Sequence, residues 1–321
     1  MSAADCSPLL ALVVCWLLLR LLLGRAWLPL DRPNERSSHA VAVPRIGGVG
    51  VVAGVAAGGL LLLPNDLLGL LLLALGLAAL SLLDDVRGLP VRLRLAVHTL
   101  AGAALVWFLP EVPAWAWWLL LPALVWMTNL YNFMDGADGL AGGMAVIGFS
   151  VYGAAAWLGG AESFALLAWA IAAAAAGFLV FNLPPARLFL GDVGSIPLGF
   201  LAGGLGLFGW LEGLWSAAFP LLVFSPFVVD ASVTLLRRAW RGEKIWQAHR
   251  EHYYQRLLRL GWSHGRLIRA EYLLMALAGI SALAVQAQPA GQAAMLLIWS
   301  GVYLALAVAI DRRWRKFNLG A

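Results

Sequence analysis

Residues 161–181 read AESFALLAWAIAAAAAGFLVF, and Glu162 is the only charged side chain among them. Crossing the hydrocarbon core of a bilayer takes a helix of about 20 apolar residues, so this stretch predicts a membrane-spanning helix. The composition of the chain agrees, because 62% of its 321 residues are hydrophobic and 12% are charged. An ordinary soluble domain is roughly half apolar and a quarter charged, so that class is excluded.

Similar apolar runs recur along the whole sequence. They predict an all-α fold, a polytopic membrane helix bundle with about 11 (10 or 11) transmembrane helices that forms one integral membrane domain over residues 1–321. No basic segment precedes the first run and further spans follow it, so we expect it to be retained and not cleaved as a signal peptide. The expected spans are 8–30, 46–64, 66–83, 93–110, 114–131, 140–158, 161–181, 196–214, 216–236, 267–286 and 291–310.

Positive charge lies on one side of this predicted bundle. Of the 22 Lys and Arg residues, 21 fall in the segments 25–45, 84–94, 182–195, 237–269 and 311–321, and Arg20 alone lies inside a span. The loops on the other side contain acids and no base, namely Asp5, Asp66, Glu111, Glu162 and Glu212. By the positive-inside rule the basic side is cytoplasmic, the N-terminus is outside and the C-terminus is inside. The pI of about 9.6 reflects this topology and contact with anionic lipid, so no nucleic-acid partner is expected.

Acidic residues collect in three of the predicted cytoplasmic loops. Those loops are expected near 31–45, 84–94, 129–140, 182–195 and 237–266. Asp84 and Asp85 lie in LSLLDDVRGLP, Asp135 and Asp138 in NLYNFMDGADGLAGG, and Asp192 in FNLPPARLFLGDVGSIPLGF. One acidic pair at a helix end is equally well explained as a topological stop, but three such sites on one face are not. Carboxylates gathered without a cation would repel and raise each other's pKa, so a divalent cation is expected. Mg²⁺ suits one or two carboxylates plus water and phosphate oxygens, and Mn²⁺ is the alternative.

Glycines near these acids point to a phosphate ligand. Gly136, Gly139, Gly142 and Gly143 surround the second acid pair, and Gly191 and Gly194 flank Asp192. Glycine-rich loops at helix N-termini present backbone N–H groups to anions, and we favour that interpretation over close helix packing for these two segments. For the small-residue series Gly50, Gly54 and Gly58 we favour packing.

Two basic segments lie on the same face. RSSHAVAVPRIGG supplies Arg36, His39 and Arg45, and AHREHYYQRL supplies His249, Arg250 and His252. Bases beside a membrane are usually solvated or in contact with lipid headgroups. However, His249 and His252 are expected one turn apart on one helical face, which suits binding of a pyrophosphate. His98, within an apolar span, is expected to be a packing contact, and His264 receives no assignment. Asp230 is also unassigned, but its place near the cytoplasmic end of a span makes it a candidate to support the site.

A second class of function remains open at this point. An ion-coupled membrane transporter also uses carboxylates within the membrane region to bind cations or relay protons. It is the weaker alternative because the acids lie at one surface, whereas a carrier places them near the middle of the bilayer. A purely structural scaffold is weaker still.

Four segments in this order carry a resemblance to a known family. DDVRGLPVRLRL, NLYNFMDGADGLAGG, FLGDVGSIPLGF and HREHYYQRL resemble the polyprenyl-phosphate N-acetylhexosamine-1-phosphate transferases, relatives of the phospho-N-acetylmuramoyl-pentapeptide transferase, over about residues 32 to 260. The resemblance implies a multi-pass enzyme of the bacterial inner membrane with a cytoplasmic active site. It would transfer an N-acetylamino-sugar 1-phosphate from a UDP sugar to polyprenyl phosphate and release UMP, starting a lipid-linked glycan such as O-antigen.

The same resemblance implies roles for individual residues. Asp84 and Asp85 would be the catalytic acid pair and Asp192 the Mg²⁺ ligand. The nucleotide would lie against Asn129, Asn132, Asp135, Asp138 and Phe189, and phosphate or sugar against Arg36, His39, Arg45, His249, Arg250 and His252. This chain has His-Arg-Glu-His where the muramoyl-pentapeptide branch has consecutive histidines, which argues for a glycan-initiating enzyme. The motifs select neither the sugar nor an oligomeric state, and a homo-oligomer is compatible with them.

Overall fold

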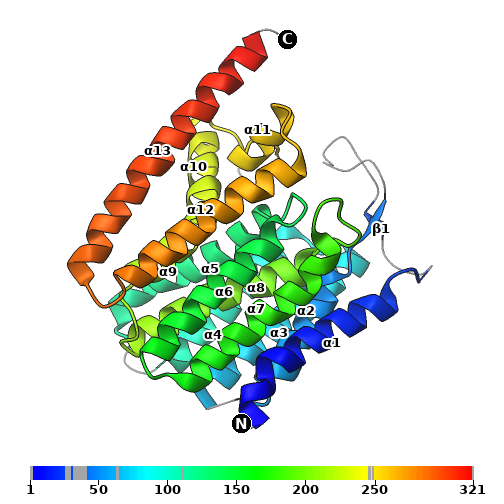
Figure 1. Ribbon diagram of the computed structural model, residues 1–321, viewed down its shortest axis with the longest axis vertical. Coiled ribbons are helices and arrows are strands. Elements are labelled where there is room, and N and C mark those ends of the chain that lie inside the picture. The colour runs from blue at the N-terminus through cyan, green and yellow to red at the C-terminus, as the bar shows by residue number, and fades with distance from the viewer. Residues whose placement is uncertain are drawn as a thin grey trace.

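The computed structural model describes residues 3–25, 30–31, 42–62, 65–109, 112–244, 247 and 249–319. As predicted, the described chain is almost entirely helical (Figure 1), and its one sheet is the short antiparallel pair β1 (Leu30–Asp31) and β2 (Val43–Pro44). The α-helices are α1 Ser7–Leu22, α2 Gly47–Gly59, α3 Asn65–Arg87, α4 Val91–Phe108, α5 Trp117–Phe133, α6 Leu140–Leu158, α7 Glu162–Asn182, α8 Asp192–Leu211, α9 Ala218–Val223, α10 Ser225–Trp240, α11 Tyr253–Arg259, α12 His264–Ala284 and α13 Pro289–Leu319. Two 3₁₀ turns, Ala3–Cys6 and Ala114–Ala116, precede α1 and α5.

The protein is a multi-pass membrane protein. Among the described residues, eight helices are long and apolar enough to cross a bilayer, so the predicted count of eleven is not confirmed. Two expected spans form shorter helices, because α2 has 13 residues and α5 has 17. The expected span 8–30 ends as a helix at Leu22.

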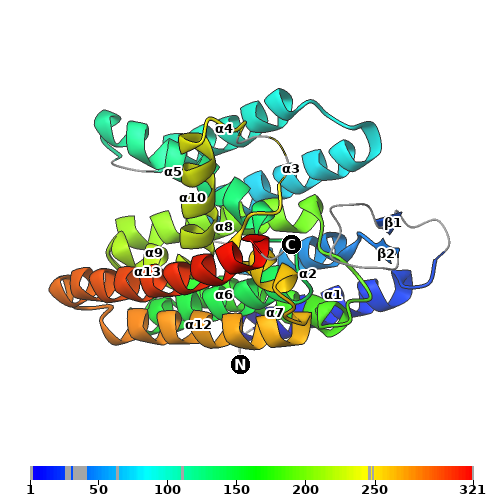
Figure 2. The same cartoon turned by 90° about the horizontal axis from the view of Figure 1, so that it is seen from above.

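The expected span 216–236 is wrong as a single helix. The chain forms the six-residue α9, turns at Phe224, and begins α10 at Ser225 with Pro226 in its first turn. Proline has no backbone N–H and a fixed φ, so it favours the start of a helix and interrupts a continuous one. The chain therefore changes direction after α9, and Figure 2 shows that α10 runs across the direction of α12 and α13.

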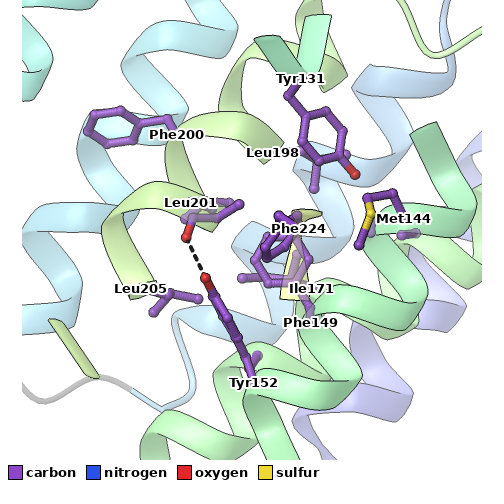
Figure 3. Close-up of a cluster of buried hydrophobic side chains, with 14 of the residues drawn as sticks. Tyr131, Met144, Phe149, Tyr152, Ile171, Leu198, Phe200, Leu201, Leu205 and Phe224 are labelled. Atoms are coloured by element: carbon purple, nitrogen blue, oxygen red, sulfur yellow. Dashed lines mark hydrogen bonds between the residues drawn. The ribbon is translucent and has the colours of Figure 1, made fainter. Parts of the chain in front are cut away.

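Aromatic side chains fill the centre of the bundle between α5, α6, α8 and α9 (Figure 3). Phe224, the residue at the α9–α10 turn, packs edge-to-face on Phe149 and Tyr152, with ring centroids 5.8 and 5.3 Å apart. The buried Tyr152 hydroxyl donates to the carbonyl of Ala202 at 3.1 Å, which satisfies its polar atom inside the apolar core. The turn that redirects α10 is therefore held by the core of the bundle.

Small residues let α1, α2 and α7 approach one another closely. A Cβ placed on Gly54 would lie 2.5 Å from the Ala11 carbonyl oxygen, and one on Gly58 would lie 2.9 Å from the Ala11 side chain. The packing interpretation of the Gly50, Gly54 and Gly58 series is confirmed, since each position borders α1. This packing fixes α2, whose N-terminal end carries the segment that reaches the candidate site.

The direction of the bundle in the membrane remains a prediction from charge. Figure 1 shows α11 and the C-terminus at the opposite end from the N-terminus. We expect a cysteine introduced at Glu162 to react with a membrane-impermeant thiol reagent on intact cells. A cysteine at Arg241 should react only after permeabilisation, with an increase of about tenfold or more over intact cells, because Arg241 belongs to the basic side. Replacing Cys6 and Cys15 beforehand removes the background, and the reverse labelling pattern would contradict the orientation.

Candidate active site

A cavity of about 460 Å³ forms where α3, α4, α5, α8 and α10 meet. Its polar lining comprises Ser81, Asp84, Arg94, His98, Asn129, Asn132 and Asp192. Its apolar lining comprises Leu80, Val91, Leu95, Pro122, Val125, Trp126, Phe133, Ile196 and Leu235. Carboxylates from two of the predicted acidic loops therefore share one cavity with a large apolar surface.

Arg94 lies between the carboxylates of Asp84 and Asp192. One of its terminal nitrogens is 2.8 Å from Asp84 Oδ2 and 3.6 Å from Asp192 Oδ2. The other oxygen of Asp84 accepts the backbone N–H of Leu89 at 2.6 Å, so both oxygens of Asp84 have partners. The neighbouring Asp85 is exposed. Asp84 thus shapes the α3–α4 turn and positions Arg94, while Asp85 presents a carboxylate to solvent.

A second arginine reaches Asp192 from the segment before α2. Arg45 Nη2 lies 3.5 Å from Asp192 Oδ1. The backbone around Arg45 runs beside Phe189, since the Phe189 N–H donates to Pro44 O at 2.9 Å and the Gly47 N–H donates to Phe189 O at 2.8 Å. This pairing places the half-buried Phe189, a predicted nucleotide contact, beside the same site.

The approach of this segment to α8 depends on two glycines. A Cβ on Gly48 would lie 2.2 Å from the backbone nitrogen of Gly194 and 2.8 Å from the carbonyl oxygen of Leu190. Backbone atoms cannot move aside as a flexible side chain can. Gly48 and Gly194 therefore allow the contact that brings Arg45 to Asp192.

Gly48→Ala should consequently destabilise the protein and misplace Arg45. We expect a thermal unfolding midpoint lower by about 5 °C, from overpacking worth about 1–3 kcal/mol, together with reduced turnover. Gly69→Ala in α3 is the matched control, because a Cβ there meets no atom within 4 Å. The control should keep or slightly raise the midpoint, since alanine favours helix more than glycine does. Equal midpoints for the two variants would contradict the close approach.

Asp192 begins α8, where the partial positive charge of the helix N-terminus favours a carboxylate. Asp135 lies near it, in the turn between α5 and α6. Burial raises the pKa of Asp135 to about 7, and the negative charge of Asp192 adds to this rise, while Arg45 and the Gly191 backbone N–H oppose it. Asp135 as a residue is half-buried, but protein atoms surround its carboxyl group. The carboxyl groups of the site, on Asp84, Asp85, Asp135 and Asp192, therefore outnumber its two arginines.

The residues present fit a hard divalent cation held by few protein ligands. In the described part of the chain no three His, Cys, Asp or Glu side chains form a ready metal cage. Mg²⁺ does not need one, because it binds through one or two carboxylates together with substrate phosphates and water. Asp192 supplies one such carboxylate. Asp135 and Asp85 lie close enough to interact electrostatically with it, so either can supply a second.

The predicted nucleotide residues divide into two groups. Asn132 and Asn129 line the cavity, where Asn132 Oδ1 accepts the Ser195 hydroxyl at 2.9 Å and Asn129 donates to the carbonyl of Val125 at 2.7 Å. Asp138 instead joins two loops: its carboxylate accepts the Ala186 backbone N–H at 3.1 Å and lies 3.4 Å from His264 Nδ1. His264, unassigned from the sequence, thus holds the start of α12 against this turn.

The expectation that His249 and His252 share a helix is wrong. Both precede α11, and their rings still lie 4.8 Å apart because the irregular segment folds back. His252 is buried and is the N-cap of α11, while Asp230 accepts the backbone N–H groups of Tyr253 and Tyr254 at 2.9 and 3.1 Å and lies 3.2 Å from His252 Nδ1. Asp230 therefore fixes the start of α11, a specific contact that its position near the end of a span did not predict.

His249 does not carry the positive charge expected of a side chain that binds pyrophosphate. Burial lowers its pKa to about 4, helped by neighbouring His252 and Arg238, so it is neutral at physiological pH. Neutral imidazole can donate one hydrogen bond but adds no positive charge. Arg250 lies half-buried in the same segment, and Arg36 and His39 lie outside the described residues.

The glycines of residues 136–143 have a steric explanation that differs from the anion-binding interpretation. A Cβ on Gly136 would lie 2.0 Å from the Tyr254 hydroxyl, and one on Gly143 would lie 2.0 Å from the Tyr272 ring. Gly139 has φ +76°, a left-handed conformation that glycine adopts without strain. Close packing against α11 and α12 therefore accounts for these glycines by itself, and the anion-binding interpretation stays a prediction.

Arg94 is a charged cavity residue that the sequence interpretation did not single out. It follows Asp84 by ten residues, beyond the reach of a local motif, and arginine near a membrane surface is commonplace. The usable signal was Pro90 before a helix whose first turn contains Arg92 and Arg94. That start turns the chain back, so an arginine there can meet an acid at the end of α3.

Comparisons with known proteins identify a family and several relatives of this chain. Residues 67–209 match glycosyl transferase family 4. The chain is 30% identical over 278 residues to the probable undecaprenyl-phosphate N-acetylglucosaminyl 1-phosphate transferase of Bacillus subtilis, a match covering 80% of this chain and 77% of that relative. It is 32% identical over 286 residues to the phospho-N-acetylmuramoyl-pentapeptide-transferase of Moorella thermoacetica, covering 79% and 88%. It is 26% identical over 321 residues to the undecaprenyl-phosphate alpha-N-acetylglucosaminyl 1-phosphate transferase of Yersinia pestis, covering 89% and 85%.

Fold and site thus define a multi-pass membrane protein with a carboxylate- and arginine-lined cavity. The extent of the similarity then decides the family: the chain belongs to glycosyl transferase family 4. The relatives named above are all transferases, so the comparisons give no support to the ion-coupled transporter.

Proposed function

We propose that the protein transfers an N-acetylamino-sugar 1-phosphate from a UDP sugar to undecaprenyl or a related polyprenyl phosphate, with release of UMP. The observation that carries this proposal is the mixed lining of the 460 Å³ cavity. A polyprenyl phosphate has one anionic end and a long apolar chain. The cavity combines Arg94 and the acidic residues with apolar side chains of α3, α4, α5, α8 and α10, and so offers surfaces for both parts.

The reaction exchanges one phosphoanhydride bond for another. An oxygen of the lipid phosphate attacks the sugar-bearing phosphorus, a new P–O bond forms, and the bond to the bridging oxygen breaks so that UMP leaves with that oxygen. Two anionic substrates must be brought together, so positioning and charge neutralisation supply most of the catalysis. Arg45 and Arg94, on either side of Asp192, are placed to reduce this repulsion.

The two acids of the predicted catalytic pair have different surroundings. Both oxygens of Asp84 are occupied by Arg94 and the Leu89 backbone, so Asp84 positions Arg94. Asp85 is exposed and is the member of the pair available to touch substrate. A general base is not essential, because the lipid phosphate is already largely ionised at neutral pH.

Asp192 is the residue proposed to hold Mg²⁺, with Mn²⁺ as a substitute. When bound, the ion would supply positive charge to the phosphate oxygens and offset the developing charge of the leaving UMP. On the protein side, Asp192 begins α8, and Arg45 and Arg94 each lie beside one of its two oxygens.

The nucleotide is proposed to bind on the Phe189 side of the site. Phe189 offers a ring for stacking against uracil, and Asn132 and Asp135 offer polar atoms near Asp192. Asn129 lines the cavity, and Asp138 supports this side by holding the loop at Ala186.

The proposed sugar or phosphate contacts remain Arg36, His39, His249, Arg250 and His252. The positive-inside rule supports a proposed position of the site on the cytoplasmic side of a bacterial inner membrane, where UDP sugars occur.

Product analysis tests this activity and identifies the sugar. Purified protein is incubated with undecaprenyl phosphate, Mg²⁺ and each of a panel of UDP sugars, and the extracted lipid is analysed by mass. We expect a lipid heavier by one N-acetylamino-sugar phosphate, together with an equal amount of UMP. Release of UDP with a sugar-monophosphate lipid would contradict the proposal, because it would mean transfer of the sugar without its phosphate.

A further inference from the structure

A second cavity, of about 730 Å³, lies between the C-terminal ends of α10 and α13 and the short helix α11, and it shares no lining residue with the carboxylate cavity. Its lining consists of Arg237, Arg241, Arg256, Arg259, Arg315, Trp240, Trp314, Glu251, Asp311 and Asn318. Five arginines face two carboxylates, which leaves a net charge of +3 in one cavity. Nothing in the proposed transfer reaction uses this cavity.

The two carboxylates are already engaged by three of the arginines. Asp311 accepts Arg237 at 2.7 Å and Arg256 at 2.8 Å, so it ties α10, α11 and α13 together. Arg241 pairs with Glu251. Within the described ranges of the chain, neither Arg259 nor Arg315 has a carboxylate within 4 Å. Among the described residues, these two arginines are the lining cations that have no carboxylate partner.

The surroundings of the cavity match the edge of a membrane. Trp240 at the end of α10 is 93% exposed, and the last turns of α13 expose Phe317 and Leu319. Tryptophan and arginine concentrate at the level of lipid headgroups, where the ring meets apolar chains and the cation meets phosphate. The Arg259 guanidinium lies 4.8 Å from the centre of the Trp314 ring, which holds the cation at this boundary. The cavity thus opens where α13, a membrane-spanning helix over Ala290–Leu319, leaves the apolar region.

We infer that this cavity binds the phosphodiester headgroup of an anionic phospholipid such as phosphatidylglycerol. Guanidinium groups bind phosphate oxygens through paired N–H donors, and basic pockets between helices at the membrane surface suit anionic headgroups. A bound headgroup engages Arg259 of α11 and Arg315 of α13. It therefore adds a second anionic link between elements that Asp311 already joins, and stabilises the folded protein.

Lipid titration of thermal unfolding tests the inference on the purified full-length protein in neutral detergent. Phosphatidylglycerol should raise the unfolding midpoint of the unmodified protein, while phosphatidylcholine should not. In Arg259→Gln/Arg315→Gln the phosphatidylglycerol concentration giving half of the effect should rise about tenfold or more, from the loss of two arginines near the headgroup. Arg312→Gln/Arg313→Gln is the matched control, since it removes the same charge from exposed positions of α13 that do not line the cavity, and it should change this concentration by less than about threefold.

Three further results decide the interpretation. An equal loss in both double variants would overturn the inference, because the effect would then belong to diffuse surface charge. A midpoint increase with inorganic phosphate or glycerol phosphate equal to that with phosphatidylglycerol would also overturn it, since a soluble anion would be the ligand. If the first double variant unfolds too readily to titrate, Arg315→Gln alone, at an exposed position in the last turns of α13, should still weaken the lipid effect, and an unchanged effect would contradict the inference.

Discussion

Replacing Asp192 with Asn should lower turnover by about 100-fold or more and move the Mg²⁺ requirement to higher concentration. The carboxylate lies at the N-terminus of α8 between Arg45 and Arg94, so an amide removes the charge that both arginines contact. The protein should still fold and insert, because asparagine is also accepted near a helix start. Initial rates of UMP release measured over a range of Mg²⁺ concentrations provide the test.

Glu162→Gln is a matched control for this substitution. Glu162 also lies in the first turn of a membrane-spanning helix, α7, but it belongs to the loops that carry no base. Its amide variant should keep turnover within about twofold and the same Mg²⁺ dependence, since a surface substitution away from special features has little effect. Near-normal turnover of Asp192→Asn at low Mg²⁺ would show that the metal assignment is wrong.

Replacing Arg94 with Gln should reduce turnover by about tenfold or more while shifting Mg²⁺ dependence the other way. Arg94 is only partly buried, so solvent moderates the loss, but its guanidinium lies within 4 Å of both Asp84 and Asp192. Without the positive charge of Arg94, more of the negative charge of Asp84 and Asp192 is left unpaired, which favours binding of a divalent cation. Half-maximal activity should therefore occur at lower Mg²⁺ than in the unmodified protein, opposite to Asp192→Asn.

Two further substitutions show whether the effect of Arg94→Gln depends on the position of the residue or only on its charge. Arg92→Gln removes an exposed arginine of the same helical turn that does not line the cavity, and it should leave turnover within about twofold. Arg94→Lys keeps the charge but not the planar donor geometry, and should recover part of the activity. An increase in the Mg²⁺ requirement of Arg94→Gln would contradict the electrostatic role given to this residue.

The sequence predicted the class of fold and the location of the acids because both depend on local patterns. Apolar runs and the one-sided distribution of Lys and Arg indicated a membrane bundle without any tertiary information. Asp84 and Asp192 indeed share a cavity, as expected for acids that follow or begin helices on one face. The break at Phe224 was also readable, since Pro220 and Pro226 interrupt the expected span 216–236.

Other features depend on long-range packing that no local pattern shows. Glycines look alike in sequence whether they bind anions or admit a neighbouring ring, and only the positions of Tyr254 and Tyr272 show the packing role of residues 136–143. His249 and His252 were expected on a helix from their spacing, but Asp230, about twenty residues earlier, sets the start of α11 after them. Arg94 gains its importance only when α4 folds back beside α3 and α8.

The most direct test of the central claim follows the phosphorus that is transferred. A UDP sugar carrying a radioactive label on the phosphorus next to the sugar is incubated with undecaprenyl phosphate and the purified protein, or with Asp192→Asn. The account predicts that the label enters the organic-extractable lipid with the unmodified protein, at a rate about 100-fold or more above that of the variant, while the released nucleotide carries no label. Label that leaves with the nucleotide, or equal transfer by the two proteins, would contradict sugar-phosphate transfer at this carboxylate site.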